Sequence, residues 1–148
     1  MKSTLNCILL IDDDEPTNFL SNLLIDEMKY CNHLQVTDTA QKALAYLQNA
    51  LNPLKKENEF PLPNLILLDI NMPCMNGWEF LEEYKKIADS KLANVIIIML
   101  TTSQHPDDKL KAEAIAEVSG FENKPLTTEM MERVLNNYAK KQERYSIY

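Results

Sequence analysis

The sequence predicts an open, doubly wound α/β fold in which five parallel strands form one sheet with helices on both faces. Four short apolar runs lead to this prediction, because each alternates with a segment of helical length. Each run also ends directly before polar residues, and ligands of such sheets bind just beyond the carboxyl ends of the strands. Right-handed crossovers between parallel strands are nearly obligatory, which leaves few other topologies. We therefore expect carboxylates, hydroxyls and an amine to meet at one rim of the sheet.

The size of the chain predicts a single domain spanning residues 1–148. Its 148 residues are 45% hydrophobic, which is enough for one domain with a real core but not for two. No apolar run approaches the roughly 18 residues of a membrane span, and the N-terminus lacks a signal-peptide pattern. We expect a cytoplasmic protein with no membrane partner. Its core is predicted at about residues 6–138, followed by a charged tail at 139–148.

Charge, cysteine and glycine content exclude several classes of function. The formal net charge is -7, whereas proteins that bind nucleic acids cluster Lys and Arg, so we expect no nucleic-acid partner. Cys7, Cys31 and Cys74 are widely spaced and odd in number, which predicts reduced thiols rather than disulfides or a zinc site. The chain has only two glycines and no glycine-rich phosphate loop. A phosphate would therefore have to be held by side chains and a metal ion.

The first strand and helix follow from local signals. The apolar strand at 6–11 leads to a helix from Glu15, which Asp14 is placed to cap. Pro16 stands in the first turn, where a missing N–H costs nothing. Five apolar residues then recur at helical spacing and predict the buried face of this helix. They are Phe19, Leu20, Leu23, Leu24 and Met28.

The middle of the chain continues the alternation of strands and helices. A weaker strand is predicted at 33–36 and a helix from Thr39. The polar, proline-rich stretch 52–63 predicts a surface loop. It is not a domain boundary, because the strand after it, at 65–68, is needed to complete the same sheet. A turn-rich loop then leads to a helix at 78–87.

The last part of the chain predicts two more strands and two more helices. The run 95–100 is the most apolar in the sequence and predicts a buried strand. The next helix begins near Pro106, where acidic residues suit the positive end of the helix dipole, and is predicted to end around Val118. A short strand at 120–123 precedes a final helix that opens at one of the two threonines at 127–128.

Three aspartates at strand ends predict a metal site. Asp12 and Asp13 follow the first strand and Asp69 follows the third, so the winding of the sheet brings them to one crevice. Converging carboxylates repel one another, and a divalent ion removes this conflict. Hard oxygen ligands favour Mg²⁺ over zinc. Asp69 is also a candidate nucleophile, because carboxylates form acyl phosphates, with Thr101 and Lys124 each holding one phosphoryl oxygen.

Four motifs together resemble the receiver domain of two-component response regulators. They are LIDDD at 10–14, LDINMP at 68–73, LT at 100–101 and KP at 124–125. They occur in the family's order and at suitable spacing within residues 6–138. The resemblance implies a flavodoxin-like, CheY-like (βα)5 fold with strand order 2-1-3-4-5. It also implies a stand-alone response regulator that works in a phosphorelay as a phosphoprotein.

The resemblance assigns roles around the phosphoacceptor. Asp69 resembles the residue that takes a phosphoryl group from a sensor histidine kinase or a histidine phosphotransfer protein. Asp12 and Asp13 resemble the acidic pair that serves Mg²⁺, and Asn71 would offer its backbone carbonyl to the same ion. Lys124 matches the phosphoryl-binding lysine, whose bond to the following proline is usually cis in this family.

Other matched positions concern signalling and access to the phosphoryl group. Thr101 and Phe121 match the hydroxyl and aromatic positions whose coupled movement signals phosphorylation to a downstream protein target. An inert core role for Phe121 is an almost equal alternative. Asn71, Thr102 and Ser103 stand where access to the phosphoryl group is controlled. Thr102 is bulkier than the Ala or Gly common there, and we expect slower dephosphorylation for this reason.

The sequence leaves two other functions open. One is an adaptor that keeps the receiver fold but signals without phosphorylation. The other is a Mg²⁺-dependent phosphohydrolase with an aspartyl phosphate, which would need a general-acid Asp where Asn71 stands. We expect a signalling protein and not an enzyme, with self-catalysed phosphotransfer and autodephosphorylation as its chemistry. The long stretch at 52–63 resembles the stand-alone receivers associated with phytochromes, some of which form homodimers.

Overall fold

Five parallel strands form one sheet in the order β2-β1-β3-β4-β5, as the resemblance implied. The computed structural model describes residues 4–56, 58–87, 90–102 and 105–146. The strands are β1 (Leu5–Ile11), β2 (Cys31–Thr37), β3 (Leu65–Asp69), β4 (Ile96–Thr101) and β5 (Gly120–Asn123). The helices are α1 (Glu15–Met28), α2 (Ala40–Leu51), α3 (Gly77–Ile87), α4 (Pro106–Glu113) and α5 (Thr128–Ser146), with a short 3-10 turn at Ser90–Leu92.

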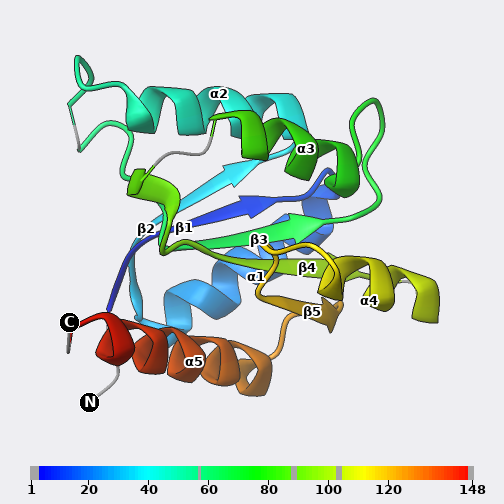
Figure 1. Ribbon diagram of the computed structural model, residues 1–148. Helices are drawn as coiled ribbons and strands as arrows, with labels where there is room; N and C mark the ends of the chain where they lie inside the picture. Colours follow the sequence, from blue (N-terminus) through cyan, green and yellow to red (C-terminus); the bar gives the residue numbers. More distant parts are fainter. Residues whose placement is uncertain (1–3, 57, 88–89, 103–104, 147–148) are drawn as a thin grey trace.

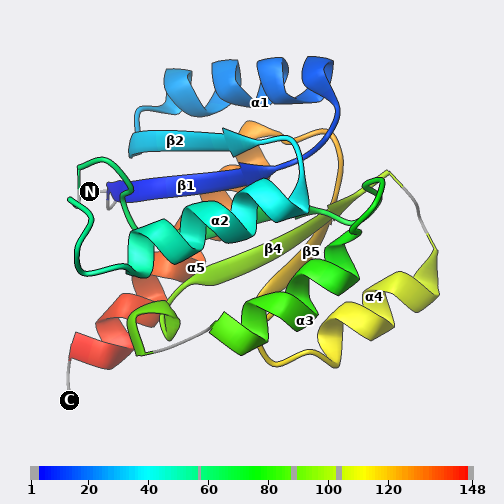
Figure 2. The ribbon, with the colours of Figure 1, turned by 90° about the horizontal axis from the view of Figure 1, so that it is seen from above.

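Helices cover both faces of the sheet, as Figures 1 and 2 show. Helices α2, α3 and α4 lie on one face, and α1 and α5 lie on the other. Side chains of β1 alternate between the two cores: Leu9 and Ile11 pack on the side of α2, whereas Ile8 and Leu10 pack on the side of α5. Because both faces are covered, the inner strands read as continuous apolar runs.

The predicted cap of α1 is confirmed, and Thr39, the predicted start of the next helix, is the N-cap of α2. The Asp14 carboxylate accepts a hydrogen bond from the backbone N–H of Thr17 at 3.0 Å, and Pro16 lies in the first turn of α1. The Thr39 hydroxyl accepts one from the N–H of Lys42 at 3.0 Å. These side chains satisfy N–H groups that have no partner within the helix. Helix starts were therefore predictable to within about a residue.

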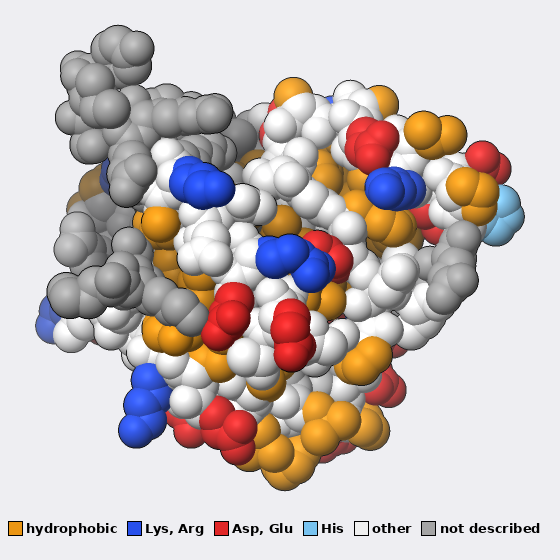
Figure 3. Space-filling view, turned by 90° about the horizontal axis from the view of Figure 1, so that it is seen from below, with side chains coloured by type: hydrophobic (Ala, Val, Ile, Leu, Met, Phe, Trp, Pro, Cys, Tyr) orange, Lys and Arg blue, Asp and Glu red, His pale blue; other side chains and the backbone are white. Residues whose placement is uncertain are grey.

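The predicted buried face of α1 is only partly right. Leu24 and Met28 pack against the core under α1, but Phe19, Leu20 and Leu23 are exposed, with 63%, 63% and 48% of their surface accessible. The residues that α1 buries are Ser21 and Ile25. Figure 3 shows hydrophobic side chains on the surface of the face formed by α1 and α5. The apolar residues of α1 form a wider stripe than one helix face can bury against the sheet.

Helix α4 is shorter than predicted, because it ends at Glu113 rather than near Val118. Beyond it the N–H of Ile115 donates to the carbonyl of Ala112, and the N–H of Val118 donates to that of Ile115, which are bonds of turns rather than of an α-helix. Ile115 and Val118 still pack against the core. The segment beyond Glu113 therefore packs against the core without continuing the helix.

The stretch before β3 and the C-terminal segment were both predicted to lack regular structure, with different outcomes. The described residues of the stretch at 52–63 form turns and irregular backbone rather than a helix or strand, and Phe60 and Leu62 among them pack against the core. Helix α5 continues to Ser146, so most of the segment predicted as a charged tail is helical.

Cys7, Cys31 and Cys74 are free thiols, as predicted. None of the helices in the described part of the chain is long and apolar enough to cross a membrane.

Candidate functional site

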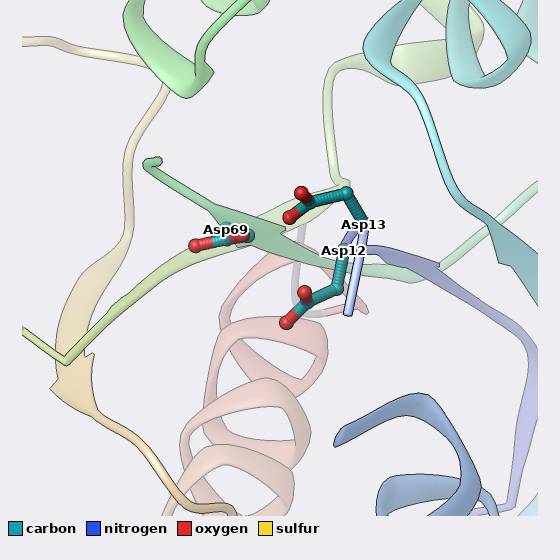
Figure 4. A group of neighbouring side chains, drawn as sticks. All are labelled: Asp12, Asp13 and Asp69. Atoms are coloured by element: carbon teal, nitrogen blue, oxygen red, sulfur yellow. The ribbon is translucent and has the colours of Figure 1, made fainter. Parts of the chain in front are cut away.

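The carboxyl ends of β1 and β3 bring the predicted aspartates together. Ile11, the last residue of β1, is paired with Leu68, so Asp12 and Asp69 follow at the same level of the sheet. Figure 4 shows the side chains of Asp12, Asp13 and Asp69 extending to the same side, beyond the ends of the two strands. The parallel register therefore creates the convergence that the sequence predicted.

The three carboxylates form a site that suits a hard cation. One oxygen from each of Asp12, Asp13 and Asp69 can be chosen so that all lie within 4.8 Å of one another. Asp12 and Asp69 are 0% and 3% exposed, whereas Asp13 is exposed. Burial and then the nearby Asp12 charge raise the pKa of Asp69 to about 6, against the opposing effect of Lys124 and the Asn71 N–H. A cation among these oxygens would relieve the repulsion.

Lys124 supplies one positive charge to this acidic site. Its Nζ lies 2.5 Å from Oδ2 of Asp12 and 3.1 Å from Oδ1 of Asp69. Burial acts to lower the pKa of Lys124, but the hydrogen bonds and charges of the two aspartates outweigh it, and the pKa is raised. The backbone N–H of Lys124 donates to the carbonyl of Thr101 at 2.8 Å, and the bond to Pro125 is cis. One ammonium against three carboxylates leaves the site negative.

The loop between β1 and α1 is fixed by hydrogen bonds that the sequence did not reveal. The N–H of Asp14 donates to Oδ1 of Asp12 at 3.0 Å, and the N–H of Asp12 donates to the carbonyl of Thr37 at 3.1 Å. Nδ2 of Asn18 donates to the carbonyl of Asp12 at 2.8 Å. The only signal for Asn18 was the presence of a short amide side chain inside a helix, where it is disfavoured.

The predicted hydroxyl and amide positions also lie at this rim. Thr101 ends β4 and is fully buried. Asn71 is exposed, and its backbone N–H donates to Oδ1 of Asp69 at 3.2 Å. Thr102 is exposed and lines a hollow of about 250 Å³ together with Lys124. Asn71 thus contacts Asp69, and Thr101 and Thr102 directly follow Leu100, the residue of β4 that pairs with Asp69.

Two further predicted positions have different outcomes. Phe121 on β5 is half-buried, pairs in register with Met99 and packs against the core on the side of α3. Its place therefore suits a core side chain as well as a mobile switch, which leaves both predictions standing. Ser103 lies outside the described residues.

Gly77 is a further residue of the site whose role only the structure reveals. Its N–H donates to the carbonyl of Ile70 at 2.9 Å, which closes the loop after Asp69. A Cβ at this position would lie 2.8 Å from the backbone oxygen of Asp69 and 2.9 Å from Cα of Ile70. Both distances are too short for carbon, and both neighbours are backbone atoms. The start of helix α3 therefore approaches the end of β3 more closely than any other residue type would permit.

Comparisons with known proteins agree with this geometry. The family described as "Response regulator receiver domain" matches residues 8–136. Response regulator Rcp1 of Synechocystis sp. is 35% identical over 101 residues, which cover 68% of this chain and 65% of Rcp1. Chemotaxis protein CheY of Halobacterium salinarum is 30% identical over 118 residues, covering 80% of this chain and 83% of that protein.

Solved structures show the same fold. A two-component response regulator from Cytophaga hutchinsonii superposes with a TM-score of 0.82 at 29% identity, over 93% of this chain and 98% of that one. The bacteriophytochrome response regulator AtBRR has a TM-score of 0.72 at 23% identity, over 91% and 93% of the two chains, and shares the fold. The order of strands in the sheet fits these matches. This chain therefore belongs to the family of response regulator receiver domains.

Proposed function

We propose that this receiver domain accepts a phosphoryl group on Asp69 from a phosphohistidine, with Mg²⁺ as its cofactor, and that it then signals through a protein-binding surface. The observation that carries the proposal is the convergence of Asp12, Asp13 and Asp69, together with the contacts of the Lys124 ammonium to Asp12 and Asp69. The phosphohistidine would belong to a sensor histidine kinase or a histidine phosphotransfer protein. Receiver domains are signalling proteins rather than classical enzymes, and the chemistry proposed here is self-catalysed.

The chemical step is an in-line transfer to a carboxylate. A carboxylate oxygen of Asp69 attacks phosphorus, a P–O bond forms, the P–N bond breaks, and the imidazole leaves with the bonding electron pair. Bound Mg²⁺ would offset the negative charge of the phosphoryl oxygens and carboxylates. Asp12, Asp13, Asp69 and the backbone carbonyl of Asn71 are the groups proposed to hold it.

Lys124 and Thr101 are proposed to recognise the transferred group. The Lys124 ammonium already lies 3.1 Å from Oδ1 of Asp69, so it is in reach of a phosphoryl oxygen attached there. The buried Thr101 hydroxyl is at the end of the neighbouring strand β4. Positioned charge and hydrogen-bond donors are the main requirements of phosphoryl transfer, because the protein has little covalent chemistry to perform.

The output is proposed to be a shift between two arrangements of the face formed by α4, β5 and α5. Contacts of the phosphoryl group with Thr101 and Lys124 favour the active arrangement, by only as much as those contacts differ between the two states. Phe121 on β5 is the proposed aromatic partner of this movement. Leu110 on α4 is 64% exposed and offers an apolar contact to a downstream protein.

The decisive experiment is incubation with acetyl phosphate and Mg²⁺, followed by intact-mass measurement. We expect the wild-type protein to gain one phosphoryl group, and the gain to be absent in Asp69→Asn and in the presence of EDTA. Asp26→Asn is the matched control, because Asp26 is an exposed aspartate of α1. It should be labelled like the wild type.

The other two functions predict different results in the same experiment. An adaptor that signals without phosphorylation would show no labelling under any condition. A phosphohydrolase would consume acetyl phosphate continuously. Labelling of Asp69→Asn to the wild-type level would contradict the assignment of the phosphoacceptor.

A further inference from the structure

The side-chain amide of Asn18 ties helix α1 to the loop that carries the acidic pair. Nδ2 of Asn18 donates to the backbone carbonyl of Asp12 at 2.8 Å. On the other side of the same residue, the backbone N–H of Asp12 donates to the carbonyl of Thr37 on β2 at 3.1 Å. The two peptide planes that flank Asp12 are therefore each fixed by one hydrogen bond, and the two bonds come from different elements.

The bond from Asn18 matters most for Asp13. The carboxylate of Asp12 is held directly, by the N–H of Asp14 and by the ammonium of Lys124. Asp13 is exposed, and within the described residues no hydrogen bond holds its carboxylate. Its direction therefore depends on the peptide plane between Asp12 and Asp13, whose carbonyl is the group that Asn18 binds.

Helix stability alone does not account for an asparagine at this position. Asparagine forms helices less readily than alanine or leucine. Oδ1 of Asn18 is buried and has no hydrogen-bond partner among the described residues, which costs free energy in the folded state. Turning the amide over would place Oδ1 against the carbonyl of Asp12, two acceptors in contact, so Nδ2 must be the atom that faces Asp12.

The unpaired oxygen belongs to a residue that lines a groove beside the acidic pair. Asn18 and Asp13 both line this groove, which has a volume of about 780 Å³ and extends over β2 toward α2. A helix residue with an unpaired buried oxygen beside a charged site is more readily explained by function than by folding. The function that its contacts indicate is to hold the backbone of the acidic pair.

We propose that Asn18 is a positioning residue for the Mg²⁺ site: it holds the Asp12 carbonyl so that the Asp13 carboxylate is set in place before the ion arrives. This inference rests on the proposed function, because it concerns the affinity for the ion of that same site. Preorganised ligands do not have to be ordered when the ion binds, so their affinity is higher. Loss of the amide donor should therefore weaken binding of Mg²⁺ even in protein that remains folded.

The experiment compares Mg²⁺ binding and stability in the unphosphorylated 148-residue chain. Isothermal titration with Mg²⁺ gives the Kd, and urea unfolding in EDTA gives the stability without the ion. We expect Asn18→Ala to raise the Kd by about tenfold, as is typical when a residue that supports a metal ligand is removed. Asn22→Ala is the matched control, because Asn22 is an exposed asparagine one turn further along α1. It should bind Mg²⁺ like the wild type.

The variant Asn18→Asp tests whether the affinity for Mg²⁺ depends on the hydrogen bond that Asn18 donates or on the local charge. This variant keeps the shape of the side chain and adds a negative charge, which by itself would favour a cation, but it cannot donate to the Asp12 carbonyl. We expect its affinity for Mg²⁺ to fall below that of the wild type in spite of the added charge. An affinity equal to or higher than the wild-type value would overturn the proposal. Because Asn18→Asp is nearly isosteric, it also serves if Asn18→Ala does not fold.

The remaining outcomes distinguish this inference from the proposed function. If the wild type and Asp13→Asn give the same titration without saturation, the magnesium site itself is refuted. If the wild type binds Mg²⁺ and Asn18→Ala binds it equally well, only the positioning role is refuted. A lower stability in EDTA together with an unchanged Kd would assign Asn18 a purely structural role, and would overturn the inference in the same way.

Discussion

The ammonium nitrogen of Lys124 lies 3.1 Å from Oδ1 of Asp69, so the proposed phosphoacceptor already contacts a cation before any phosphoryl group is present. The same nitrogen contacts Asp12, so one positive charge serves two buried carboxylates. Lys124 follows β5 at the edge of the sheet, whereas Asp69 ends the central strand β3. The ion pair therefore spans the rim at which the proposed chemistry takes place.

Replacement of Lys124 by methionine should destabilise the metal-free protein at neutral pH. Two buried carboxylates would lose their partner, and removal of one member of a buried ion pair typically costs roughly 3 kcal/mol. Urea unfolding in EDTA measures the change in the free energy of unfolding. Lys109→Met, at an exposed position on α4, should have little effect. Equal stability of the two variants would show that the contacts of Lys124 contribute nothing to the fold.

The titration of Asp69 should make the metal-free protein less stable as pH rises. The folded-state pKa of about 6 lies above the ordinary value of 3.8, so between these values the folded state binds more protons than the unfolded state. The free energy of unfolding then falls with rising pH, by about 1.4 kcal/mol for each unit of pKa difference. Below this window the contribution is fully present, and above it the contribution is lost.

The pH effect is isolated by comparison with Asp69→Asn, which cannot ionise. Urea unfolding in EDTA across the window should show the wild type losing stability relative to this variant as pH rises. The loss should be reduced by saturating Mg²⁺, because a ligand that binds only the folded state stabilises it. Parallel pH profiles of the two proteins would show that the pKa of Asp69 is not raised in the folded state.

The two glycines of the chain should respond differently to replacement by alanine. The new Cβ of Gly77→Ala would collide with backbone atoms of Asp69 and Ile70, which cannot turn aside as the end of a side chain can. We expect a loss of about 1 to 3 kcal/mol in unfolding free energy, together with slower labelling by acetyl phosphate. At Gly120 the close atom among the described residues is Cδ1 of Ile98, the end of a flexible side chain, so Gly120→Ala should be tolerated better. Thermal unfolding and labelling rates of the two variants test this order, and the reverse order would refute it.

Thr102 is predicted to slow the hydrolysis of the acyl phosphate. Its side chain is exposed and lines a hollow together with Lys124, whose ammonium contacts Asp69. We expect the bulk of Thr102 to hinder the approach of water to a phosphoryl group on Asp69. Thr102→Ala should therefore lose the phosphoryl group several times faster than the wild type in a chase without acetyl phosphate. Thr4→Ala is a suitable control, because Thr4 precedes β1 at the opposite end of the sheet. If the acyl phosphate of Thr102→Ala decays at the wild-type rate, Thr102 does not limit the access of water to the phosphoryl group.

Much of the fold was predictable because its signals are local. The apolar run at β4 and the capping residue Asp14 act through neighbours in sequence, and the structure confirms both. The errors arose where burial depends on distant contacts. Apolar spacing in α1 suggested that Phe19 is buried, but that side chain lies beyond the reach of the sheet. Helix α4 was predicted to continue to about Val118, but it ends at Glu113, and the residues that follow form turns.

The candidate site divides in the same way. The aspartates and Lys124 were identified from sequence, because strand ends in a parallel sheet must meet at one rim and because the motifs resemble a known family. The contact of Asn18 with the Asp12 carbonyl and the close approach of Gly77 to Asp69 were not. In both cases a residue of a helix contacts the backbone of a segment elsewhere in the chain. The sequence does not reveal how close the two segments come.

The sequence by itself determined how strands and helices alternate along the chain, because this follows from local periodicity. It also determined the acidic character of the site and the identity of its ionisable groups, because these follow from residue chemistry. Tertiary structure alone decided the distances and the electrostatics. The burial of Asp69 beside Asp12 raises its pKa, and the position of Lys124 makes the site tolerable without an ion. Both effects depend on separations of a few ångströms between residues far apart in the chain, and Coulomb energies at such distances change steeply with small displacements.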